Sequence, residues 1–302
     1  MRSRASVPGR WGGLVGGGLG WLLGLIMVAP FLYMLTTALT GAEDSLDHTP
    51  LVGPSHLHPE TFAAALAALP FGRLVLNSLI FSGAVVAGQV FTSTTAAYAF
   101  ARLRFAGRDR LFLGYLSVLM LPAGVLLVPR FLLINALGWV DTYPGLVSSE
   151  LVSVAGIFLL RQFFLTLPRD LEDAARLEGA GEWTIFRRIV LPQSRPALVT
   201  FAVLALAAQW RSFLWPLVAT RSSDMRVLEV GIASLHGAYD LNWPYQMAVA
   251  TAAVVPLAVL YFVAQRHVTR ALELGAAAGT AWPPSAPRPD RPLSAGPAGR
   301  RA

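Results

Sequence analysis

Residues 167–196 read LPRDLEDAARLEGAGEWTIFRRIVLPQSRP, a charged, helix-forming segment between long apolar runs. Pro168 fits a first helical turn, because the N–H that it lacks has no partner there. The acidic residues of this turn suit the positive end of a helix dipole: Asp170, Glu172 and Asp173. Gly179 can take the left-handed conformation that ends a helix, and Pro192 is expected to stop a second short helix. The segment therefore predicts a helix, a tight glycine turn and a second helix.

Two adjacent alanines, Ala174 and Ala175, give the first of these helices a shallow apolar face. Another protein can approach such a face closely, which favours a docking element. The alternative is a pair of amphipathic helices that rest on lipid headgroups. Composition alone leaves both interpretations open.

The rest of the chain consists of long apolar runs. Of its 302 residues 55% are hydrophobic and 14% charged, whereas soluble domains carry about 25% charged residues. A helix needs about 20 residues to cross the hydrocarbon core, and four uncharged runs reach that length: 14–39, 74–101, 111–129 and 243–265. Two further runs each contain one charge, Glu150 in 143–160 and Arg211 in 196–220. We therefore predict an all-α membrane protein with six transmembrane helices.

The basic residues, which are all arginines, set the expected topology. They gather in the N-terminal tail, the loop at 102–110, the segment 167–196 and the C-terminal region. The intervening loops are acidic or poor in arginine, so the positive-inside rule places both termini and the segment 167–196 in the cytoplasm. The same distribution explains the net charge of +7 without a nucleic-acid partner.

Two residue types are missing from the chain. Without cysteine there is no disulfide or Cys-ligated metal, and the irregular spacing of His48, His56 and His58 does not indicate a metal site. Without lysine there is no phosphate-binding P-loop, so any ATP must bind to another polypeptide. We expect no catalytic residues, no metal and no cofactor in this chain, and therefore a transport subunit rather than an enzyme.

The segment 167–196 resembles the "EAA" coupling loop of permease subunits in binding-protein-dependent ABC importers. The resemblance lies in Asp173-Ala174-Ala175, Gly179 and the Ile-x-Leu-Pro of 189–192. Further segments are similar to carbohydrate-type permeases, especially the smaller maltose-type subunit: 77–79, 96–102, 137–138, 141–143, 158–164, Trp210 and 213–217. The chain departs from the family pattern at four positions. Asp173 stands where the family usually has Glu, and Glu178 where it has Asp. Ser149 replaces a common Pro, and Arg211 replaces the family's Asn.

The resemblance implies a transport pathway for a sugar or polyol in the bacterial inner membrane. Its implied partners are two copies of an ATPase that carry ATP and Mg, a second permease, an extracytoplasmic solute-binding protein and membrane lipid. The residues it assigns to ATPase coupling are Glu172, Asp173, Ala174, Ala175, Gly179, Ala180, Ile189, Leu191 and Pro192. The alternatives are a self-sufficient secondary transporter and an ABC importer permease for a non-sugar solute.

Five residues are candidates for the substrate pathway: Asn77, Gln209, Trp210, Arg211 and Trp215. Aromatic rings beside hydrogen-bonding groups suit stacking on a sugar ring. The alternatives are an interfacial aromatic belt for the tryptophans and a snorkelling side chain for Arg211. We expect Glu150 to be a solvated or hydrogen-bonded structural residue.

These features divide the chain into five parts. They are a cytoplasmic tail at 1–13, a first span at 14–40, an external loop at 41–72, a permease core at 73–267 and a disordered cytoplasmic tail at 268–302.

Overall fold

The structure is a computed structural model that describes residues 10–40, 57–238, 243–259 and 262. Within these residues the chain is helical and has no strand. The elements in order are α1 Arg10–Ala38, α2 Pro59–Ala67, α3 Phe71–Arg102, α4 Arg108–Ser117, η3 Val118–Met120, η4 Ala123–Leu126, α5 Leu127–Ala136, α6 Tyr143–Ser148, α7 Val154–Thr166, α8 Asp170–Leu177, α9 Glu182–Ile185, η5 Phe186–Val190, α10 Leu191–Gln193, α11 Arg195–Trp210, α12 Leu214–Ala219 and α13 Leu228–Ala238, followed by a helix at Trp243–Val259. The expectation of an all-helical protein with several apolar helices is confirmed.

Two of the described helices are long and apolar enough to cross a membrane, the segment Gly20–Ala38 of α1 and α3. Two bent pairs bring this to four if each is one span: Arg108–Met120 with Gly124–Ala136, bent by 93°, and Glu182–Gln193 with Arg195–Trp210, bent by 75°. The apolar helices α7 and Trp243–Val259 are shorter. The count of six spans stays a prediction.

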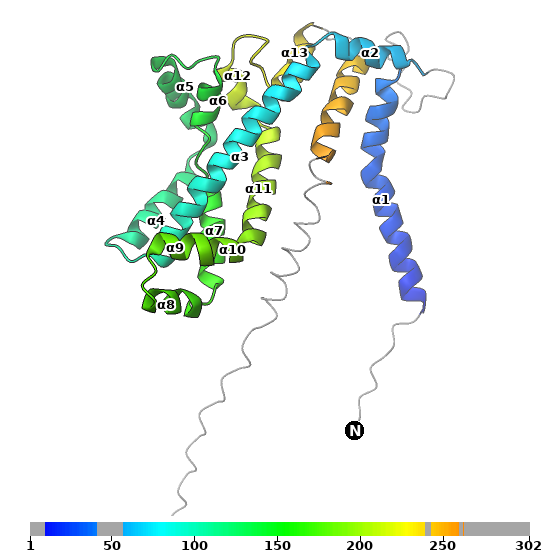
Figure 1. Ribbon diagram of the computed structural model, residues 1–302. Helices are drawn as coiled ribbons and strands as arrows, with labels where there is room; N and C mark the ends of the chain where they lie inside the picture. The colour runs from blue at the N-terminus through cyan, green and yellow to red at the C-terminus, as the bar shows by residue number, and fades with distance from the viewer. Residues whose placement is uncertain (1–9, 41–56, 239–242, 260–261, 263–302) are drawn as a thin grey trace, which may run out of the picture.

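The long helix α3 is the centre of the fold. Figure 1 shows it running the length of the helical body, with α7 and α11 beside it. The crossing of these three helices needs Gly156, because a Cβ at this position would lie 2.2 Å from Cζ of Phe201 and 2.8 Å from Oγ of Ser93. The buried residues around the crossing form the largest core cluster, which extends to α9 and η5.

The helix α1 stands apart from this body (Figure 1). Its last residues pack on α2, α13 and Trp243–Val259 through a small cluster that includes Ala38, Ala65 and Leu235. Most of its other described side chains are exposed, with Trp21 at 80%. The predicted external loop at 41–72 contains the helix α2, whereas the expected tails at 1–13 and 268–302 lie almost wholly outside the described residues.

Three of the predicted spans are not straight helices. The run 111–129 is broken between Met120 and Gly124, around Pro122, which has no N–H to continue a helix. The run 143–160 divides into α6 and α7, and the run 196–220 divides into α11 and α12. The two charges that interrupted these runs lie at the breaks, since Glu150 sits between α6 and α7 and Arg211 follows α11.

Polar side chains of α3 donate hydrogen bonds to backbone carbonyls that have no helical partner because the helix is interrupted after α6. Gln89 Nε2 donates to the carbonyl oxygen of Glu150 at 2.8 Å, and Thr92 Oγ1 donates to that of Leu151 at 2.7 Å. In an apolar surrounding a free carbonyl is costly, so such partners make the interruption tolerable. The polar residues of α3 therefore hold the broken span in place.

Candidate functional site: the loop formed by α8, α9 and α10

In Figure 1 the helices α9 and α10 lie beside the lower end of α3, and α8 lies below them at the bottom of the helical body. At the end of α8, Gly179 has φ 85°, in the left-handed region. The N–H of Ala180 donates to the carbonyl of Ala175 at 2.9 Å, and the N–H of Gly179 to that of Arg176 at 3.0 Å. This pair of bonds is the Schellman pattern, in which the glycine lets the chain reverse without strain.

The two prolines do not act as the sequence predicted. Pro168 lies outside the first turn, because α8 begins at Asp170 after the N-cap Arg169. Pro192 does not stop the second helix, which continues to Gln193 through a π-helical segment. The N–H of Leu191 donates to the carbonyl of Phe186, five residues back. This wider turn accommodates a residue that has no N–H and crowds the carbonyl four residues before it.

Glu172 points into the protein. Its carboxylate forms an ion pair with Nε of Arg102 at 3.1 Å, and the two side chains are only 3% and 2% exposed. Arg102 also donates from Nη2 to the carbonyl of Leu167 at 2.8 Å. The carboxylate of Glu172 therefore faces α3 and also lies 3.4 Å from Arg176, and its coupling role stays a prediction without support from these contacts.

A second set of polar contacts joins α8 to α9. Arg176 donates from Nη1 to Asp173 at 2.8 Å and from Nε to Glu182 at 2.9 Å. Glu182 also accepts from the hydroxyl of Tyr98 on α3 at 2.7 Å. The hydrogen bond from Arg176 lowers the pKa of Glu182 despite the opposing effect of burial. The acidic group therefore stays charged, and the contacts link α8, α9 and α3.

The other motif residues divide between an inner and an outer side of the loop. The inner ones are partly buried and pack on the core cluster: Ala175, Ala180, Ile189 and Leu191. The outer ones are exposed: Asp173, Ala174, Gly179 and Pro192.

The outer side of α8 also carries two large apolar residues that the motif does not include. Leu171 is 58% exposed and Leu177 91%. Together with Ala174 they form what we call the outer apolar face. On α9, Trp183 is 63% exposed and lines a recess beside α3 together with Tyr98 and Phe186. Sequence spacing could have found the outer apolar face, because Leu171, Ala174 and Leu177 follow each other at intervals of three residues along α8. An exposed apolar face of this kind is typical of a surface that contacts another protein or a membrane.

Comparison with known proteins identifies the family. The family model of the binding-protein-dependent transport system inner membrane component matches residues 89–274. The chain belongs to this permease family. Its relatives include an arabinooligosaccharides transport system permease protein of Halalkalibacterium halodurans, 33% identical over 86% of this chain and 97% of the relative. An sn-glycerol-3-phosphate transport system permease protein of Brucella abortus is 31% identical over 83% and 93% of the two chains.

The fold is also found in a solved structure. The crystal structure of a bacterial ABC transporter involved in the import of the acidic polysaccharide alginate contains a chain with a TM-score of 0.73 to this one. That likeness covers 87% of this permease chain and 99% of the other, at 22% sequence identity. It therefore shows a shared fold.

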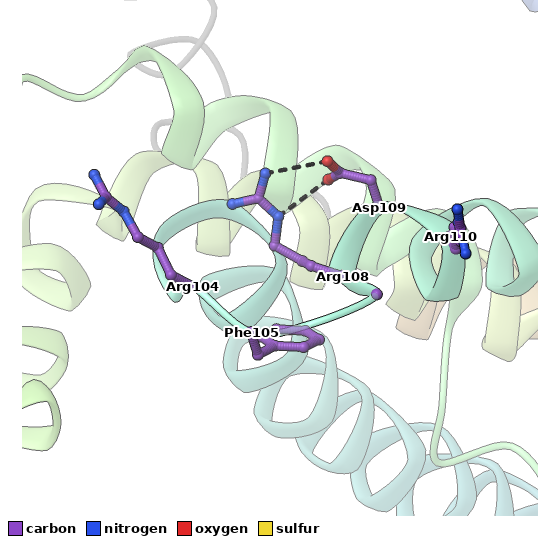
Figure 2. Close-up of a pocket in the computed structure, with 6 residues that line it drawn as sticks. Arg104, Phe105, Arg108, Asp109 and Arg110 are labelled. Carbon is purple, nitrogen blue, oxygen red and sulfur yellow. Dashed lines mark hydrogen bonds and ion pairs between the residues drawn. The ribbon is translucent and has the colours of Figure 1, made fainter.

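Beside the loop the permease surface is basic and hollowed. A recess of about 590 Å³ is lined by Arg104, Phe105, Gly107, Arg108, Asp109 and Arg110. Figure 2 shows the guanidinium of Arg108 against both oxygens of Asp109, the closer contact being 3.0 Å, while Arg104 and Arg110 point away from this pair. A neighbouring recess of about 570 Å³ lies between the end of α3 and α8. This end of the molecule therefore concentrates positive charge, as the positive-inside rule predicts for a cytoplasmic surface.

The candidate pathway residues are not brought together. Asn77 is fully buried, and its Nδ2 donates to the carbonyls of Asp224 and Arg226 at 2.7 and 2.8 Å. Its Oδ1 accepts from the hydroxyl of Tyr143 at 2.7 Å. The contacts of Asn77 hold a loop and leave little capacity for a substrate.

The two tryptophans are buried as well. Trp210 and Trp215 are each 4% exposed. The indole N–H of Trp215 donates to the carbonyl of Leu146 at 2.9 Å, and the guanidinium of Arg130 lies 4.2 Å from its ring centroid. Neither ring offers a free face for a sugar in this arrangement, and their pathway role stays a prediction without support from these contacts.

Sequence reasoning missed the polar cluster around Glu150. Its carboxylate pairs with Nη2 of Arg130 and lies 3.5 Å from Nε2 of Gln209, while Arg130 also donates to Oγ of Ser149 at 2.9 Å. The hydrogen-bonded structural role expected for Glu150 agrees with these contacts. Arg130 gave no signal because it lies at the end of an apolar run, where an arginine is ordinary.

Arg211 and the histidines complete the candidate positions. Arg211 is exposed at the end of α11. Burial raises the pKa of Glu229, and the positive charge of Arg211 reduces that rise. Nδ1 of His58 lies 2.6 Å from the carboxylate of Glu60, whereas His48 and His56 fall outside the described residues.

Proposed function

We propose that this chain is the permease subunit of an ATP-driven importer that moves a sugar or a related polyol into the bacterial cytoplasm. The observation that carries the proposal is the outer apolar face, which lies on the segment that resembles the coupling loop and which we assign to contact with an ATPase. The substrate class follows from the relatives that serve arabinooligosaccharides and sn-glycerol-3-phosphate.

The proposed assembly contains this chain, a second permease, two ATPase copies that bind ATP and Mg, and an extracytoplasmic binding protein. The spans in it are α1, α3, the bent pair of α4 and α5, α7 with α6, α11 with α12, and the helix that begins at Trp243. Both termini and the loop of α8, α9 and α10 then face the cytoplasm, which agrees with the arginines around the recess in Figure 2.

In this proposal the chain does no covalent chemistry. ATP binding closes the two ATPases, and their surfaces carry the outer apolar face with them. The spans change between an inward-open and an outward-open arrangement. The bound nucleotide and the binding protein can drive this change only by their different affinities for the two states.

Reconstitution tests the proposal. The purified chain alone should neither bind nor hydrolyse ATP, and proteoliposomes that contain it alone should take up no sugar. Adding the ATPase, the second permease and the binding protein should give ATP-dependent uptake of a neutral oligosaccharide or a glycerol phosphate from a test panel. Stoichiometric nucleotide binding by the isolated chain would contradict the proposal, as would uptake driven by an ion gradient without the ATPase.

A further inference from the structure

A partly buried set of contacts, which we call the clasp, joins the loop to the end of α3. It consists of Tyr98 and Arg102 on α3, Glu172 on α8 and Glu182 on α9. The carboxylate of Glu172 lies 3.1 Å from Nε of Arg102, and that of Glu182 accepts from Tyr98 at 2.7 Å. Arg102 also donates to the carbonyl of Leu167, just before α8, at 2.8 Å.

The clasp connects the loop to α3, a helix that does not adjoin the loop in the sequence. The loop is connected to α7 through residues 167–169, and to α11 directly after α10. Movement of the loop therefore pulls on α7 and α11 through the backbone. The central helix α3 ends about seventy residues earlier in the chain, so its connection to α8 and α9 depends on side chains.

The polar contacts of the clasp differ in exposure. The side chain of Glu182, which accepts from Tyr98, is 46% exposed, and contacts at the surface contribute little. The pair between Arg102 and Glu172 is enclosed, with side chains 2% and 3% exposed. Sliding α8 over α3 would separate two charges whose side chains are almost fully removed from solvent, beside a recess that both line, and breaking such a pair costs more than breaking an exposed one.

We propose that α3, α8 and α9 move as one rigid body during transport, and that Glu172 and Arg102 are the positioning residues that make them do so. Force applied to the outer apolar face then reaches the central helix directly. The inference rests on the proposed function and assigns Glu172 an inward role, on the side of α8 opposite to the docking surface.

Distances between spin labels test the rigid body without disturbing the clasp. The chain has no cysteine, so Phe91→Cys on α3 and Asp170→Cys on α8 give one defined pair of labels at two exposed positions. The complete importer is measured without nucleotide and after trapping with ATP and vanadate. We expect the same narrow distance distribution in both states. A shift of about 5 Å or more, the size of a one-turn slide between helices, would overturn the inference.

Substitution tests the role of the ion pair. Glu172→Gln should keep the ATPase bound and active while transport per ATP hydrolysed falls at least about fivefold, the lower range of ordinary coupling between sites. Asp170→Asn removes an equal charge from an exposed position of the same helix and should leave this ratio unchanged. Normal coupling in Glu172→Gln would overturn the inference, as would a proportional loss of hydrolysis and transport.

A double variant covers the case in which Glu172→Gln does not fold because Arg102 is left buried and unpaired. Arg102→Met/Glu172→Met leaves no buried charge, and such replacements are often tolerated. It should assemble and bind the ATPase but show the same loss of transport per ATP; normal coupling would overturn the inference. If the unchanged chain captures no ATPase, the proposed function itself fails. If it captures the ATPase and transports while the label distance shifts, only the rigid body fails.

Discussion

Leu177 offers the sharpest test of the outer apolar face. It is the last residue of α8, and it is 91% exposed. In a complex with an ATPase its side chain would pass from water into the interface. Leu177→Ala removes three carbon atoms from that contact, which at about 0.8 kcal/mol each amounts to roughly 2 kcal/mol of binding free energy. The affinity for the ATPase should therefore fall about 30-fold, since 1.4 kcal/mol corresponds to a factor of ten.

The measurement is a titration of the partner ATPase onto the permease pair in nanodiscs, together with the transport rate at saturating ATPase. The thermal stability of the permease should change little, because an exposed side chain contributes little to folding. The matched control is Leu204→Ala on α11, a leucine 56% exposed away from the loop. An affinity change below about twofold for Leu177→Ala, or an equal change in the control, would refute the assignment of this face to the ATPase.

Three further predictions follow from other parts of the structure. Gly156→Ala should lower the free energy of unfolding by about 1–3 kcal/mol, because its Cβ would lie 2.2 Å from Phe201, and thermal unfolding in detergent measures this. Burial raises the pKa of Asp141, but the hydrogen bonds from the backbone N–H groups of Arg221 and Ser222 outweigh it, so that the pKa is lowered. Its stabilisation is therefore complete above the ordinary pKa of about 4 and is lost as the pH falls through the lowered value; a melting series against pH should show this loss in the wild type and not in Asp141→Asn. Arg211→Asn restores the usual family residue, and uptake of neutral and anionic sugars at matched expression should show a changed preference with intact assembly; an unchanged profile would leave Arg211 as a snorkelling residue.

The direction of a side chain depends on distant partners, and this limited the site prediction. The end of α8 at Gly179 is local chemistry, so the turn could be placed from the sequence. Glu172 and Asp173 are adjacent acids in the same turn, and nothing in their neighbourhood says which one faces inward. Glu172 faces inward because Arg102, seventy residues earlier on α3, provides a buried partner for its carboxylate.

The same limit changes how the motif can be tested. Ala175 looked like part of a docking face, but it is partly buried and packs on the core cluster. An arginine at that position would disturb the loop itself, so loss of transport in Ala175→Arg would not separate docking from folding. Leu177 and Leu171 separate the two, because their side chains project from the opposite side of α8 into solvent.

The broken spans show what a hydropathy pattern contains and what it omits. An apolar run reports that a segment can lie in lipid, but not that its backbone stays helical throughout. In this chain the signal for one break lies on a different helix. Gln89, Thr92 and Ser93 stand at helical spacing on α3 and bond to the carbonyls of Glu150, Leu151 and Ser153. Polar side chains on one side of an apolar helix need hydrogen-bond partners. A single carboxylate in a neighbouring apolar run indicates where that run is interrupted and can offer free backbone groups as the partners. Read together, the two segments predict a broken helix that neither predicts alone.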